Sequence, residues 1–83
     1  MSTDLIYEKV VKAVSEGLVV DPSRITLTTR LQEDLGATSL DYVTIALDLE
    51  DSFGKHMFED EAREFATVSD IVDYVRTRLQ AAG

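Results

Sequence analysis

Apolar side chains recur at helical spacing in three segments of the chain, which predicts three main helices. The first segment runs from Thr3 to Gly17, with its apolar positions at Ile6, Val10, Ala13 and Val14. The second runs from Ser39 to Phe53 and is followed by Gly54, a residue that favours helix ends. The third opens on the capping-box sequence Thr67-Val68-Ser69-Asp70, and its apolar face holds Val68, Ile71, Val72, Val75 and Leu79.

The remaining segments predict loops and one short helix. Val19 to Gln32 is a long connection with the only proline, and we expect three of its side chains to pin it to the core: Ile25, Leu27 and Leu31. Residues 25–28 resemble a short strand, but the pattern offers no partner strand. A short helix is expected near Asp60 to Phe65. The predicted fold class is all-α, a small bundle of three main helices plus one short helix, in a single domain over residues 1–83.

The second predicted helix has two apolar stripes. At about 100° per residue, one stripe faces the core and contains Tyr42, Ile45, Ala46, Leu49 and Phe53. The other contains Leu40, Val43 and Leu47, and it is flanked by Asp41, Asp48 and Asp51. An apolar strip edged with acids is typical of a docking surface. The pattern equally allows a helix that the bundle buries on two sides.

Composition excludes several classes of site. The 83-residue chain has no cysteine and a single histidine, His56, so a disulfide framework, a thiolate metal site and a histidine-based catalytic dyad are excluded. Apolar runs such as Leu18 to Val20 are far too short to span a membrane. The N-terminal residues lack a signal-peptide pattern. We therefore expect a monomer in the cytoplasm, with no membrane insertion.

The net charge of −8 lies entirely in the middle of the chain. Between Glu33 and Glu64 there are ten acidic residues and only two basic ones, Lys55 and Arg63, whereas the flanks are neutral. Nucleic acid is an improbable ligand for such a segment, because phosphate binding needs the opposite sign. A partner protein with a basic surface is the natural complement, although an acidic face also serves solubility alone.

Ser39 stands just past a glycine turn, at the expected start of the second helix. The unpaired N–H groups at a helix N-terminus suit a serine that carries a phosphate ester. On position alone, however, Ser39 is better explained as a helix cap. Thr38 is a second candidate for the cap, which would leave the Ser39 hydroxyl available.

Residues 36–41, Gly-Ala-Thr-Ser-Leu-Asp, resemble the attachment motif of acyl carrier proteins, usually written Gly-x-Asp-Ser-Leu. The resemblance covers nearly the whole chain: the first helix, the long loop that closes with Glu33 to Gly36, the acidic second helix and the Ala66-Thr67-Val68 start of the last helix. It implies a carrier and not an enzyme. A phosphopantetheinyl transferase would attach 4′-phosphopantetheine covalently to Ser39, and the arm's thiol would hold acyl groups as thioesters.

The resemblance also implies partners and a docking surface. Acyl-loading and acyl-processing enzymes with basic patches would dock on the second helix, at Leu40, Asp41, Val43, Leu47, Asp48, Glu50 and Asp51. Three positions depart from the family pattern: Thr38 replaces an acid before the serine, Thr44 replaces an acid that faces partners, and Phe58 replaces a loop proline. These departures predict a specialised member and not the housekeeping carrier of fatty-acid synthesis.

An acyl chain would enter between the helices, where bundles place ligands. The expected lining is Tyr42, Ala46, Leu49, Phe58, Phe65 and Ile71. Tyr42 is larger than the small residue that many family members have there, and we expect it to narrow the entrance and favour short or polar cargo.

Two other interpretations of the chain remain open. One is a peptidyl or aminoacyl carrier, and the other is a helical adaptor that binds partners without an arm. An independent enzyme is disfavoured, since no base stands near Ser39 by local spacing. The acids at Glu59, Asp60, Glu61 and Glu64 lack the pattern of a calcium loop, so no metal site is predicted.

Overall fold

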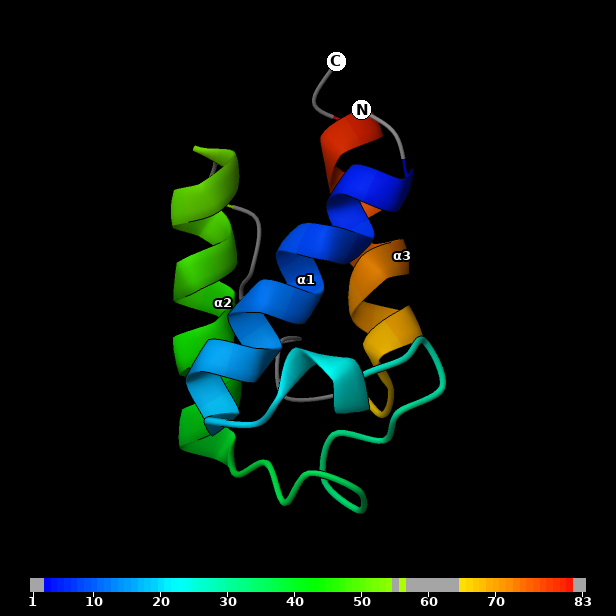
Figure 1. Cartoon of the computed structure of the whole chain (residues 1–83). Helices are drawn as coiled ribbons and strands as arrows, with labels where there is room; N and C mark the ends of the chain where they lie inside the picture. Colours follow the sequence, from blue (N-terminus) through cyan, green and yellow to red (C-terminus); the bar gives the residue numbers. More distant parts are fainter. Residues whose placement is uncertain (1–2, 55, 57–64, 82–83) are drawn as a thin grey trace.

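Three α-helices and one short 3₁₀ turn make up the fold in the computed structural model, which describes residues 3–54, 56 and 65–81. Helix α1 spans Thr3–Leu18, η1 spans Pro22–Arg24, α2 spans Ser39–Phe53 and α3 spans Val68–Ala81 (Figure 1). The predicted all-α class with three main helices is confirmed. The short helix expected near Asp60 to Phe65 lies outside the described residues, apart from Phe65, which is not helical.

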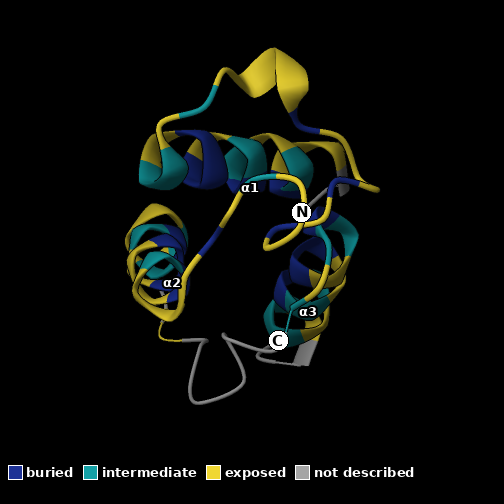
Figure 2. Cartoon of the chain, turned by 90° about the horizontal axis from the view of Figure 1, so that it is seen from below, coloured by how far each residue is buried: buried dark blue, intermediate teal, exposed yellow. Residues whose placement is uncertain are grey.

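Helix α1 is the central element of the bundle. It packs against both α2 and α3, whereas no Cα atoms of α2 and α3 come within 8 Å of each other in the described residues. The η1 turn lies on the other side of α1, away from both helices (Figure 2). Each helix turns an apolar face inward, because burial removes that area from water. The core contains Ile6, Val10, Ala13, Val14, Ile25, Leu31, Ala37, Tyr42, Ile45, Ala46, Leu49, Val68, Ile71, Val72 and Val75.

The long connection between α1 and α2 is fixed to the core by two of the three expected side chains. Ile25 and Leu31 are buried, but the expectation for Leu27 was wrong, since 46% of it is exposed. The Leu27 carbonyl instead accepts a hydrogen bond from the Ser69 N–H at 2.9 Å. Backbone pairing therefore holds this point of the loop.

The loop also pairs with the segment before α3. Arg30 and Thr67 form an antiparallel β-bridge. The Leu31 N–H donates to the Ala66 carbonyl at 2.9 Å, and the Val68 N–H donates to the Thr29 carbonyl at 3.1 Å. Residues 25–28 form no strand, as expected, but the loop does have a backbone partner that the sequence pattern did not reveal. These bonds hold the loop that leads to α2 against the start of α3.

Helix α1 ends one residue later than predicted, in a left-handed turn at Val19. The Val19 φ is 55°, and the Val20 N–H donates to the Ser15 carbonyl at 3.0 Å, the long bond of a Schellman motif. Among the described residues, no helix has the length and apolar character needed to cross a membrane.

Candidate functional site

Helix α2 begins with a complete capping box made by Thr38 and Asp41. The Asp41 N–H donates to the Thr38 hydroxyl oxygen at 3.3 Å, and the Thr38 N–H donates to Asp41 Oδ2 at 2.9 Å. The Thr38 hydroxyl also donates to Asp41 Oδ2, at 3.1 Å. Threonine at the cap and an acid three residues later satisfy two N-terminal N–H groups at once. Thr38 is therefore the N-cap of α2.

Ser39 is the first residue of α2, and its side chain is exposed. The interpretation of Ser39 as the helix cap was wrong, because Thr38 occupies that position. Within the described part of the chain, the Ser39 hydroxyl takes part in no hydrogen bond that would have to break before it reacts. The helix dipole favours a negative group at this end. A phosphodiester on Ser39 thus fits the residues around it.

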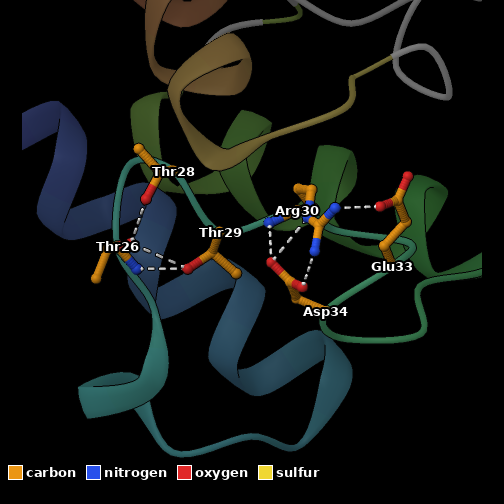
Figure 3. Close-up of polar contacts among 6 residues, drawn as sticks. All are labelled: Thr26, Thr28, Thr29, Arg30, Glu33 and Asp34. Carbon is orange, nitrogen blue, oxygen red and sulfur yellow. Dashed lines mark hydrogen bonds and ion pairs between the residues drawn. The ribbon is translucent and has the colours of Figure 1, made fainter.

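The turn before Ser39 is fixed by a cluster around Arg30 (Figure 3). The Arg30 backbone N–H donates to Asp34 Oδ2 at 2.8 Å, and the Arg30 guanidinium Nη2 donates to Asp34 Oδ1 at 3.0 Å. The guanidinium also forms an ion pair with Glu33. The Arg30 hydrogen bonds hold the pKa of Asp34 below its ordinary value, and those with Asp34 raise the pKa of Arg30. Two of the central acids are thus paired within the chain.

Arg30 was missed by the sequence reasoning. The available signal was its spacing of three and four residues from Glu33 and Asp34, which brings opposite charges together in a helical turn. A second ordering contact lies just upstream, where the Thr26 N–H donates to the Thr29 hydroxyl at 2.8 Å (Figure 3). The path that leads to Ser39 is therefore held by side chains as well as by the backbone.

The second apolar stripe of α2 faces solvent. The exposed fractions are 74% for Leu40, 51% for Val43 and 61% for Leu47. The alternative that the bundle buries α2 on two sides was therefore wrong. Gly54, with a φ of 64°, ends the helix in the left-handed conformation that glycine adopts readily, as predicted.

The acids expected around this stripe differ in their surroundings. Asp51 is exposed, Asp48 is partly buried, and the Asp41 carboxylate accepts the capping hydrogen bonds. Glu50 differs most, because its side chain is only 15% exposed and its Oε2 lies 2.9 Å from Nδ1 of His56. Glu50 therefore presents less charge to a partner than the sequence predicts.

The residues expected to line an acyl pocket lie in and around the core. Tyr42, Ala46, Leu49 and Ile71 are buried in it, and Phe65 packs against it. Phe58 lies outside the described residues, as does the acidic run considered for calcium. In the described part of the chain, no cluster of three or more His, Cys, Asp or Glu side chains is arranged to hold a metal ion.

Comparisons with known proteins define the class of this chain. The family model for the phosphopantetheine attachment site matches residues 8–75. An acyl carrier protein from Lactobacillus johnsonii is 35% identical over 77 residues, which cover 93% of this chain and 96% of that protein. An acyl carrier protein from Thermotoga maritima is 40% identical over 78 residues, which cover 94% of this chain and 96% of that protein.

The chain is thus a phosphopantetheine-binding carrier domain. It belongs to the acyl carrier protein family, and its prosthetic group is a covalently attached 4′-phosphopantetheine. Members of this family are carriers and not catalysts, and they interact with a phosphopantetheinyl transferase and with biosynthetic enzymes.

Proposed function

We propose that Ser39 is the attachment residue and that the protein carries acyl intermediates between biosynthetic enzymes. The observation that supports this most is the division of roles at the start of α2. Thr38 and Asp41 cap the helix, so the exposed Ser39 hydroxyl is available at the positive end of the helix dipole. When bound, the arm supplies a terminal thiol that forms thioesters. The chain has no cysteine of its own for that chemistry.

The exposed face of α2 is the proposed docking surface for partner enzymes. Leu40, Val43 and Leu47 provide apolar contact area beginning next to Ser39, and Asp41, Asp48 and Asp51 provide negative charge. A partner with a basic patch would be attracted by this charge, and the three apolar side chains would be buried at the centre of the interface. The strongly acidic helix favours an acyl carrier over a peptidyl or aminoacyl carrier. Cytoplasmic localisation and a monomeric state stay predictions.

Attachment to Ser39 can be tested by incubating the purified chain with a promiscuous phosphopantetheinyl transferase and coenzyme A. Mass spectrometry of the intact protein should show the addition of one phosphopantetheine group. Ser39→Ala should abolish the addition. Ser52→Ala is the matched control, because Ser52 is an exposed serine towards the other end of α2. This variant should still gain the group.

Two results would contradict the proposal. A wild-type chain that stays unmodified would favour the arm-free adaptor, which shares the fold but does not use the serine. A Ser39→Ala variant that is still modified would place the arm on another residue. Peptide mapping of the modified protein would then identify that residue.

A further inference from the structure

The space between α2 and α3 is the part of the bundle where an acyl chain would compete with the protein's own side chains. Both helices pack on the side of α1 that lies away from η1 (Figure 2), and their Cα atoms stay more than 8 Å apart in the described residues. Leu49 of α2 and both Ile71 and Val72 of α3 are buried in the core that these helices share. Tyr42, one helical turn after Ser39, belongs to the same buried core.

Tyr42 bridges this space with a hydrogen bond. Only 2% of the residue is exposed, and its hydroxyl donates to the Phe65 carbonyl at 2.9 Å. Burial raises the pKa of Tyr42 above its ordinary value, while a hydrogen bond with the Gln32 side chain partly offsets that effect. The hydroxyl therefore remains a neutral donor at and well above neutral pH. The bond joins α2 directly to the segment that leads into α3.

The acceptor of this bond is itself held in place. The Phe65 ring packs edge-on against Tyr74 of α3, with 5.2 Å between the ring centroids. The next residue, Ala66, donates its N–H to Asp70 Oδ2 at 3.1 Å and accepts a hydrogen bond from the Leu31 N–H at 2.9 Å. The segment that carries the Phe65 carbonyl therefore contacts both α3 and the loop, and Tyr42 is anchored to a segment with several contacts of its own.

We infer that Tyr42 is a specificity-determining residue that keeps the acyl group out of the core, so that the protein carries short or polar acyl groups. The inference rests on the proposed function. A long apolar chain would have to displace a buried aromatic ring, break the Tyr42–Phe65 bond and reopen a packed interior. A short or polar group gains little from burial, so it remains in solvent on the arm and accessible to partner enzymes.

The test compares wild-type protein whose arm is loaded with a butyryl, octanoyl or dodecanoyl group. Methyl NMR signals of Leu49 and Ile71 and the Tm should be the same in these forms as in the form with a free thiol. Tyr42→Ala removes the ring and its anchor. In this variant the octanoyl and dodecanoyl groups should shift both methyl signals and raise the Tm by about 5 °C or more, because the chain fills the vacated volume.

A milder variant keeps the test decisive if Tyr42→Ala does not fold. Tyr42→Phe retains the ring but removes the bond to Phe65, and the dodecanoyl group should then shift the two methyl signals. Tyr7→Phe is the matched control, since the Tyr7 hydroxyl also donates to a backbone carbonyl, that of Ile25, at 3.2 Å. Tyr7 borders a surface pocket with Pro22 on the η1 side of α1. Loss of the Tyr7 hydroxyl should leave the Leu49 and Ile71 methyl signals of the loaded forms unchanged.

Each remaining outcome counts against a defined claim. If long acyl groups shift the core methyl signals in the wild type, Tyr42 does not exclude them. If they shift these signals in none of the Tyr42 variants, another residue excludes them. In both cases the arm is attached, and only the inference about Tyr42 fails. If mass spectrometry shows that no arm is attached at all, the proposed function fails and the inference fails with it.

Discussion

At the scale of single residues, Val19 is notable because a β-branched side chain occupies the left-handed region, with a φ of 55°. Its side chain is 89% exposed, so it gains little from packing. For a residue with a Cβ, this conformation costs roughly 1–2 kcal/mol, and β-branching makes it rarer still. The position closes α1 in a Schellman motif, where glycine is the usual residue.

Val19→Gly should therefore stabilise the protein by about 1 kcal/mol, after allowing for the greater freedom of glycine in the unfolded chain. Thermal unfolding should show a rise in Tm of about 4–8 °C. Val19→Ala is the control, because it removes the exposed methyl groups and keeps the strained Cβ. An alanine variant as stable as the glycine variant would show that exposure of the valine, and not its backbone conformation, limits stability.

Residue-level signals account for much of what the sequence predicted at the site. The glycine turn before Ser39 and Gly54 after Phe53 bounded α2 correctly, whereas the pairing of Asp41 with the Thr38 cap was not predicted. The η1 turn was missed although its signals are local. Asp21 caps it by accepting a hydrogen bond from the Ser23 N–H at 2.9 Å, and Pro22 occupies its first position.

At the scale of elements, α2 has two apolar faces with different roles. Leu49 belongs to the core and is fully buried, whereas Leu47, two residues earlier, is mostly exposed beside Val43 and Leu40. Both leucines contribute equally to the apolar composition of the helix. Helical periodicity assigned them to different stripes, and the packing of α2 against α1 shows that the stripe with Leu47 is the one left available to partners.

The docking proposal predicts opposite effects for these two leucines. Leu49→Ala should lower the free energy of unfolding by about 2–5 kcal/mol, because it leaves a cavity. Leu47→Ala should change it by less than about 0.5 kcal/mol. The same Leu47→Ala variant should lower the kcat/KM of the phosphopantetheinyl transferase for this chain, on the order of tenfold. Unfolding by urea and single-turnover labelling measure the two effects. Unchanged labelling kinetics for Leu47→Ala would remove Leu47 from the docking surface.

At the scale of the whole molecule, the contacts that the sequence did not reveal join distant segments. The Tyr42–Phe65 hydrogen bond spans 23 residues, and the bridge between Arg30 and Thr67 closes a longer loop. Helical periodicity indicates which face of an element is buried, but it carries no information on which carbonyl a buried hydroxyl meets. Leu27 was likewise expected in the core from its spacing, but a single backbone hydrogen bond from Ser69 holds its segment instead.

The charge distribution is also a property of the whole molecule. The net charge of −8 is concentrated in the central segment, and Arg30 pairs with only two of its acids. Asp51 lies in the last turn of α2, where the helix dipole disfavours a negative group, and that turn contains no basic residue. We therefore expect these acids to reduce the stability of the folded chain, and the proposed docking role would explain why a carrier has them.

This repulsion predicts that salt stabilises the protein. Raising the ionic strength from 0.01 M to 1 M shortens the Debye length from about 30 Å to about 3 Å, which screens the acids from one another. Screening of the few exposed ion pairs in the described residues opposes this, but exposed pairs contribute little to stability. The Tm should therefore rise with NaCl concentration. A Tm that falls or stays constant would show that the central acids do not destabilise the fold.

A pair of charge-neutralising variants locates the effect on α2. Asp51→Asn should raise stability by about 0.3–1 kcal/mol at low salt, and the gain should shrink at high salt. Asp41→Asn removes the same charge from the capping end, where the carboxylate accepts two hydrogen bonds from Thr38, and should lower stability. If both variants gained equally, net charge alone would explain the result. Stability changes of opposite sign would show that Asp51 destabilises α2 at its C-terminal end and that Asp41 stabilises it at its N-terminal end.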